Sequence, residues 1–278
     1  MKRKPNPPLN IRYHWTVDST LLRAMCDKAN AARVKEILED ALSNVDTVVF
    51  GKELGKMPKY KISILGDSIS TYLGYNPYGY SVYYKEDRLY DNELESVDDT
   101  WWKQVIDGLD GELCVNNSYS GSLVAGIVDT AGCSVERCSG LHKNSPPDVI
   151  LIYMGTNDRG FEINLGMVAP NDTMGFYGAY RTMLSQIKKN YPTAKIVCGT
   201  LLMAYKKDFI SDDYDRFVRE DGRYNEAIRL AVKEEGCLLA DIALSGERYE
   251  SLDYCHPTQK GHKTMAELWL KQLIPLLN

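Results

Sequence analysis

An α/β fold with a central parallel sheet is predicted by the alternation of strand-like and helix-like segments in this chain. Residues 148–154 begin with Asp148 and are otherwise continuously apolar, which is typical of a parallel strand covered on both faces. Alternation of this kind, with right-handed crossovers, gives a doubly wound sheet that binds ligands outside the carboxyl ends of its strands. Polar motifs follow three of the strand-like segments within a few residues, so we expect them on that one edge.

The elements are assigned in chain order from their apolar patterns. Short apolar runs predict strands at residues 62–65, 113–116, 148–154, 194–200 and 237–242. Longer segments with helical character predict helices at residues 101–106, 179–190, 224–235 and 258–277. A helix therefore falls in most of the connections between strands, as parallel pairing requires.

The first part of the chain carries no catalytic signal. Residues 1–17 are polar and rich in proline, and residues 19–42 carry apolar side chains at helical spacing. A short edge strand is expected at residues 47–50. We interpret residues 1–59 as an N-terminal helical leader packed on a main domain of residues 60–278.

Composition excludes several classes of protein. The chain has 278 residues, of which 44% are hydrophobic and 26% charged, as in an ordinary globular protein, and its net charge of −5 gives no basic footprint for nucleic acid. Its seven cysteines are an odd number without zinc-site spacing, so we expect free thiols and no metal. No secretion signal or membrane span is recognisable, which predicts a cytoplasmic protein without a membrane partner.

A serine and a histidine at opposite ends of the main domain supply the parts of a nucleophilic site. Ser68 ends a Gly-Asp-Ser sequence that directly follows the strand expected at 62–65. Asp253 precedes His256 by three residues, so its carboxylate can orient the imidazole. A hydroxyl with such an imidazole is the minimum equipment for nucleophilic acyl transfer. We interpret Ser68 as nucleophile, His256 as general base and Asp253 as the residue that orients the base.

A simpler explanation remains open for Gly-Asp-Ser in isolation. Asp67 and Ser68 are residue types that cap a helix well. The chain contains no Gly-x-Ser-x-Gly sequence, so the nucleophile elbow of the α/β-hydrolases does not compete. The other histidines lie in the leader, in a loop and in the last predicted helix: His14, His142 and His262.

Two positions between the serine and the histidine are interpreted as oxyanion donors. Gly121 follows the strand expected at 113–116, and a glycine lets a backbone N–H approach a substrate oxygen. Asn157 follows the run at 148–154 and offers a side-chain amide. With the Ser68 N–H they would form a three-donor oxyanion hole. Seen alone, a turn glycine and an Asx turn explain the two residues as well.

These segments resemble the four motif blocks of the SGNH hydrolases, also called GDSL esterases or lipases. The matching residues, in the family's order, are 66–68, 116–121, 155–158 and 253–256. The resemblance covers about residues 60–278 and implies a flavodoxin-like three-layer α/β/α sandwich and a metal-free esterase without a cofactor. It gives Ser68, Gly121, Asn157 and His256 the family's named roles. Ser118 departs from the pattern, since relatives often carry glycine there.

A tyrosine-rich segment lies between the nucleophile and the helix expected at 101–106. Its members are Tyr72, Tyr75, Tyr78, Tyr80, Tyr83, Tyr84 and Tyr90. Such rings can stack on sugars or surround an acyl chain, but they can equally attach the segment to the body of the protein. We take Asp67, Tyr75, Asp158 and Arg137 as candidate substrate contacts. The abundance of hydroxyls and rings favours a short acyl group, such as acetyl, on a carbohydrate or another polar carrier.

Three hypotheses of different class follow. The first is a serine esterase with an acyl-enzyme on Ser68, with carbohydrate deacetylation ahead of lysophospholipid or thioester hydrolysis. The second is a non-catalytic carbohydrate- or anion-binding module, which would not need the base. The third is a redox or metal protein that uses its cysteines. The expected partner is a small-molecule or oligosaccharide ester, and a homo-oligomer is possible on this sequence.

Overall fold

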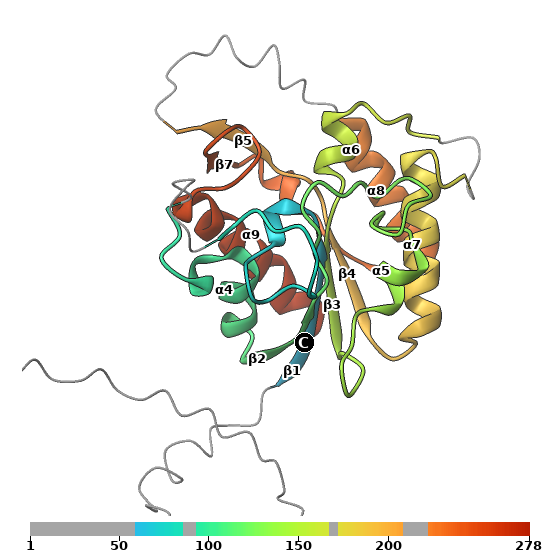
Figure 1. Cartoon of the computed structure of the whole chain (residues 1–278), viewed down its shortest axis with the longest axis horizontal. Coiled ribbons are helices and arrows are strands. Elements are labelled where there is room, and N and C mark those ends of the chain that lie inside the picture. Colours follow the sequence, from blue (N-terminus) through green and yellow to red (C-terminus); the bar gives the residue numbers. More distant parts are fainter. Residues whose placement is uncertain (1–58, 86–92, 167–171, 208–221) are drawn as a thin grey trace, which may run out of the picture. The chain divides into compact units, whose positions relative to one another are not determined.

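A five-stranded, wholly parallel sheet forms the middle layer of the protein, with its strands in the order β2-β1-β3-β4-β6 (Figure 1). The computed structural model describes residues 59–85, 93–166, 172–207 and 222–278, and the structural statements below concern these residues. The strands are β1 Tyr60–Gly66, β2 Gly111–Asn116, β3 Val149–Tyr153, β4 Lys195–Gly199 and β6 Leu238–Ala240. The strand order reverses between β1 and β3, and in such sheets the crevice at the reversal point binds the ligand.

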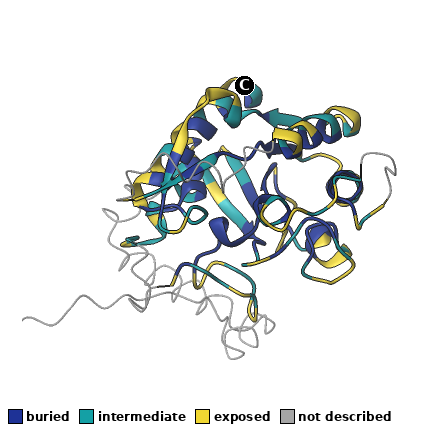
Figure 2. Ribbon diagram, turned by 90° about the horizontal axis from the view of Figure 1, so that it is seen from above, coloured by how far each residue is buried: buried dark blue, intermediate teal, exposed yellow. Residues whose placement is uncertain are grey.

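Helices cover both faces of the sheet, which confirms the predicted α/β fold with a central parallel sheet. One face carries α4 Trp101–Gly108 and α9 Gln259–Leu277, and the other carries α5 Val135–Ser139, α7 Phe176–Asn190 and α8 Gly222–Glu235 (Figure 1). A further short helix, α6 Thr156–Gly160, follows β3. Figure 2 shows buried residues on the inner sides of the helices and exposed residues on their outer sides.

The core forms where the apolar strands meet these helices. Every residue of β3 is fully buried, as its continuous apolar run predicts for a strand covered on both faces. On one side of the sheet, Trp101 of α4 stacks on Trp269 of α9 with ring centroids 5.1 Å apart. This packing fixes α9 directly after the loop that carries His256, so the core also holds the predicted base in place.

A second, smaller sheet positions that same loop. It pairs β5 Met203–Lys206 with β7 Arg248–Ser251 in parallel. Ser251 donates its hydroxyl to the Tyr205 carbonyl at 2.8 Å and accepts the Tyr254 N–H at 2.9 Å. The chain between β7 and α9 is closed by a hydrogen bond of 2.8 Å from Leu252 N to the carbonyl oxygen of His256.

Several helices and strands have different bounds from those predicted, and some elements were not predicted at all. The first strand runs over Tyr60–Gly66 rather than 62–65, and α7 begins at Phe176 rather than 179. The short helices α5 and α6 and the β5–β7 pair were not expected. The expected helix at 19–42, the edge strand at 47–50 and Tyr90 lie outside the described residues. In the described part of the chain, no helix is both long and apolar enough to cross a membrane.

Candidate active site

The turn after β1 presents Ser68 at the carboxyl edge of the sheet. A Cβ on Gly66 would lie 2.5 Å from Ser70 Oγ, so this close approach requires glycine. Asp67 caps the 3-10 turn Ser68–Ser70 by accepting the Ile69 N–H at 3.1 Å. The capping explanation is therefore correct for Asp67, and it leaves the Ser68 hydroxyl available for another partner.

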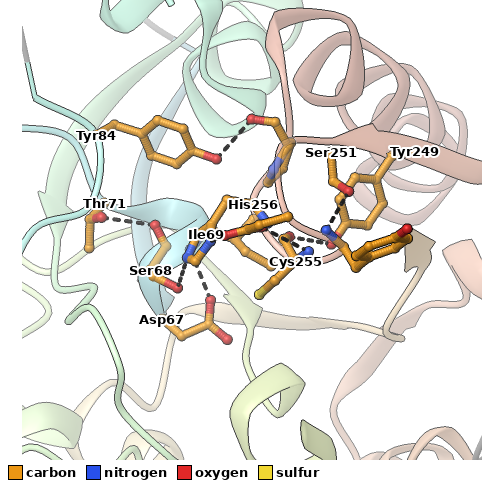
Figure 3. A network of polar contacts seen from close by, with 12 residues as sticks. Asp67, Ser68, Ile69, Thr71, Tyr84, Tyr249, Ser251, Cys255 and His256 are labelled. Carbon is orange, nitrogen blue, oxygen red and sulfur yellow. Dashed lines mark hydrogen bonds and ion pairs between the residues drawn. The ribbon is translucent and has the colours of Figure 1, made fainter. Parts of the chain in front are cut away.

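That partner is the imidazole of His256 (Figure 3). Ser68 Oγ lies 2.8 Å from His256 Nε2, although the two residues are 188 positions apart. On the other side of the ring, His256 Nδ1 lies 2.7 Å from Asp253 Oδ2. The fold thus joins a hydroxyl, an imidazole and a carboxylate in the order that nucleophilic catalysis needs.

The Asp253 carboxylate also organises the loop that carries the histidine. Its Oδ1 accepts the backbone N–H of His256 at 2.7 Å and that of Cys255 at 3.1 Å. Burial alone would raise the pKa of Asp253, but the hydrogen bonds and charge of His256, with the two backbone N–H groups, hold that pKa below its usual value. The carboxylate is consequently ionised at neutral pH, as a partner for a protonated imidazole must be.

The two predicted oxyanion residues follow neighbouring strands at the same edge. Gly121 lies beyond β2 with φ +81°, a left-handed conformation that favours glycine, and the space around it is open. Asn157 lies in the first turn of α6, beyond β3, and its Nδ2 donates to the Ser122 carbonyl at 2.8 Å. This bond places the amide beside the loop of Gly121, while the role of both residues as oxyanion donors stays a prediction.

The profile of the GDSL-like lipase/acylhydrolase family matches residues 60–211, more than half of the 278 residues. The chain belongs to this family. It is therefore an ester hydrolase, and the resemblance of its motif blocks to the SGNH hydrolases is confirmed. Among curated proteins, none matches the chain.

Solved structures share the fold of this GDSL-like hydrolase. A GDSL-like lipase from Bacteroides ovatus ATCC 8483 has 25% identity and a TM-score of 0.58, over 78% of this chain and 98% of the other. A GDSL-like lipase from Bacteroides uniformis ATCC 8492 has 24% identity and a TM-score of 0.61, over 78% and 96%. A carbohydrate acetylesterase family member from Sinorhizobium meliloti has 16% identity and a TM-score of 0.53, over 78% and 99%, which shows a common fold alone.

Asp158 and Arg137 do not lie at the rim of the site, in contrast to what we expected of substrate contacts. Asp158 is fully buried and accepts the N–H groups of Val124 at 2.8 Å and Ala125 at 3.0 Å, so it fastens the loop after Gly121 to α6. Burial raises the pKa of its carboxyl. The carboxylate binds backbone N–H groups, which corrects its expected role as a substrate contact.

The Arg137 guanidinium is a structural tie inside the protein. Its side chain is fully buried and donates to the carbonyl oxygens of Asn117 at 3.1 Å, Thr130 at 2.7 Å and Gly66 at 2.8 Å. Burial lowers its pKa to about 10. It thereby connects the ends of β1 and β2 behind the nucleophile, and the sequence did not indicate this because α5, which carries it, is too short to show a period.

Asp67 is also buried and does not lie at the surface of the site. The side chain is fully buried, and its Oδ2 has no hydrogen-bond partner among the described residues. Burial raises its pKa to about 6, against the hydrogen bond from Ile69. The residue caps the nucleophile turn, and its expected role as a substrate contact is corrected accordingly.

The sequence left two roles open for the tyrosines of the segment before α4: contact with substrate, or attachment of the segment to the body of the protein. Different tyrosines fit different roles. Tyr72 and Tyr84 are buried and attach the segment to the body of the protein. Tyr75 is 43% exposed and packs against the rings of Tyr72 and Trp102, so its contact with substrate stays a prediction. Tyr83 stacks directly on His256, a contact that no sequence pattern signalled.

Two other histidines and two cysteines, which could have been alternative catalytic groups, have contacts or pKa shifts that indicate a structural role. Burial lowers the pKa of His262 to about 3, and Nδ1 of the neutral ring accepts the backbone N–H of Trp101 at 3.1 Å. His142 contacts the Tyr191 hydroxyl at 3.0 Å. Burial raises the pKa of Cys133 to about 11 and that of Cys138 to about 12, which disfavours the reactive thiolate form.

Proposed function

We propose that this GDSL-like hydrolase is a serine esterase that cleaves carboxylic esters through an acyl-enzyme on Ser68. The observation that carries the proposal is the chain of contacts from Ser68 Oγ to His256 Nε2 at 2.8 Å and from His256 Nδ1 to Asp253 at 2.7 Å. A buried serine that serves only as a cap does not need an imidazole with an ionised carboxylate behind it.

In the acylation step, His256 Nε2 takes the hydroxyl proton as Ser68 Oγ attacks the ester carbonyl carbon. The oxyanion of the tetrahedral intermediate accepts hydrogen bonds from the N–H groups of Ser68 and Gly121 and from the Asn157 amide. The same histidine then gives its proton to the alcohol oxygen, the C–O bond breaks and the alcohol leaves. Water, deprotonated by His256, attacks the acyl-enzyme and releases the acid.

The proposed substrate is a short-acyl ester, such as acetyl, on a carbohydrate or another polar carrier. Tyr80 and Tyr119 are partly exposed and pack edge to face with centroids 5.1 Å apart. Ser120 N donates to the Ser81 carbonyl at 2.9 Å, which ties the loop of Gly121 to the tyrosine-rich segment. Amphipathic rings beside the predicted oxyanion donors provide the apolar faces and polar edges that a sugar ring needs.

A longer acyl chain is the second candidate, because exposed apolar side chains lie on the Asn157 side of the site. Phe161 follows Asn157 by one helical turn and is 72% exposed. The Gly126 N–H donates to the Thr173 carbonyl at 2.8 Å, and the residues that follow these two, Ile127 and Met174, have exposed side chains. These residues favour the lysophospholipase or thioesterase alternative.

Hydrolysis of p-nitrophenyl esters with acyl chains from two to sixteen carbons separates the two candidates. The proposal expects the highest kcat/KM at two carbons, activity on acetylated oligosaccharides, and little effect of Phe161→Ser. A preference for long chains that Phe161→Ser removes would contradict the short-acyl proposal and support the second candidate. Ser68→Ala serves as the blank in both series.

A further inference from the structure

The ring of Tyr83 lies flat against the imidazole of His256. The two ring centroids are 3.4 Å apart and the ring planes differ by 4°, so one face of the imidazole is covered. Tyr83 is partly buried and comes from the tyrosine-rich segment, far from His256 in the sequence. The stacked contact therefore joins the segment after the nucleophile to the loop that carries the base.

Hydrogen bonds anchor Tyr83 to the nucleophile turn. Its backbone N–H donates to Thr71 Oγ1 at 2.9 Å, and Thr71 Oγ1 donates in turn to the Ser68 carbonyl at 2.8 Å (Figure 3). The next residue, Tyr84, is fully buried and donates its hydroxyl to the Pro257 carbonyl at 3.0 Å. The pair thus has fixed contacts with the residues that flank both ends of the Ser68–His256 hydrogen bond.

The hydrogen bonds of Ser251 and Asp253 hold the backbone of the loop that carries His256, whereas the plane of the imidazole depends on contacts with the ring itself. The Asp253 side chain is 46% exposed, and residues 252–257 belong to neither a helix nor a strand. Both ring nitrogens must be aligned at once, Nδ1 toward Asp253 and Nε2 toward Ser68, so a rotation of the ring breaks at least one contact. Stacking fixes the plane of the ring, and the π-face of an aromatic ring attracts the cation that His256 becomes when it takes the proton.

We propose that Tyr83 is a positioning residue, whose ring holds the imidazole of His256 in the plane that serves both Asp253 and Ser68 during acylation. The inference rests on the proposed function. Burial and the negative charge of Asp253 raise the pKa of the Tyr83 hydroxyl, so the phenol ring is neutral at neutral pH.

Labelling of Ser68 with a small fluorophosphonate tests this role. The labelling rate depends on the alignment of the base, whereas the labelled fraction at the end of the reaction reports how much enzyme is correctly folded. The variants are Tyr83→Leu, which removes the ring, and Tyr83→Phe, which keeps it. Tyr60→Leu makes the same change in a partly buried tyrosine at the amino end of β1 and is the matched control.

Tyr83→Leu is expected to lower the labelling rate constant and kcat by about 10- to 100-fold, the size expected from misplacing a catalytic group. Its KM and final labelled fraction should remain near wild type, while Tyr83→Phe restores most of the rate and Tyr60→Leu changes nothing. An unchanged rate in Tyr83→Leu would overturn the proposal, as would equal losses in the Leu and Phe variants. Failure to label the wild type would instead reject the serine esterase itself.

A measurement on the unaltered chain covers the case in which Tyr83→Leu does not fold. Protons held over the face of an aromatic ring resonate upfield, so the His256 ring protons should show this shift in NMR spectra of the wild type. The chain has only four histidines, which makes assignment practicable. Shifts typical of a solvent-exposed histidine would show that the stack does not form and would overturn the proposal.

Discussion

Asp253 holds His256 at two points. One carboxylate oxygen lies 2.7 Å from the ring Nδ1, and the other accepts the backbone N–H of the same residue at 2.7 Å. A single side chain therefore selects the ring orientation and shapes the loop that presents it. Because its carboxyl pKa is held below the usual value, the charge behind the imidazole persists through the neutral range.

Replacement of that charge should weaken catalysis without removing the base. Asp253→Asn keeps a hydrogen-bonding group near Nδ1 but removes the carboxylate that stabilises the imidazolium, so we expect kcat/KM to fall by about 10²-fold or more. His256→Ala should cost more. Measurement of kcat/KM for both variants at one pH checks this order, and an Asn variant as active as the wild type would contradict the role of Asp253.

The Asn157 amide provides a separate test of the oxyanion hole. Asn157→Ala removes one donor and should lower kcat by about 10²- to 10³-fold, with a smaller change in KM. Asn190→Ala is the control, because it also removes an amide-to-carbonyl hydrogen bond, of 3.1 Å to Cys138, at the far end of α7. Equal and small effects in the two variants would mean that Asn157 only anchors its loop.

Asp67 should impose a pH dependence on stability. Its folded-state pKa is about 6 and its usual value 3.8, so between these values the folded protein binds more protons than the unfolded chain at this position. Its contribution to the free energy of unfolding therefore falls as pH rises from 4 to 6. Relative to wild type, Asp67→Asn should gain up to about 3 kcal/mol between pH 4 and pH 7 in urea unfolding. The exposed Asp129→Asn should show no such gain, and a constant difference for Asp67→Asn would refute the expectation.

A variant of Arg137 distinguishes a structural role of this residue from a substrate-binding role. Arg137→Leu removes the guanidinium that binds the carbonyl oxygens of Asn117, Thr130 and Gly66 inside the protein, which should lower the free energy of unfolding by about 3 kcal/mol or more. Because the guanidinium cannot reach a substrate, KM for the folded fraction should stay near wild type. Thermal unfolding and steady-state kinetics check the pair of outcomes, and a raised KM with unchanged stability would restore the substrate-contact interpretation.

The features predictable from the sequence are those with a local cause. The buried strand β3 follows from its apolar run, and Asp253 and His256 lie within one turn of the chain, so their contact follows from spacing. The pairing of β5 with β7 and the stack of Tyr83 on His256 join distant segments, and no periodic pattern marks either. Residue type alone could not show that Asp158 and Arg137 are buried, because both types are also common at a rim.

Covalent labelling of Ser68 with a fluorophosphonate tests the proposed mechanism most directly. The folded enzyme should take up one equivalent of a fluorophosphonate, mass spectrometry should map it to Ser68, and ester hydrolysis should stop in step with the labelling. Ser68→Ala should fold normally, take up no label and have no turnover. Ester hydrolysis that persists in Ser68→Ala, or a wild type that remains unlabelled while it hydrolyses esters, would show that the contact between Ser68 and His256 is not the catalytic one.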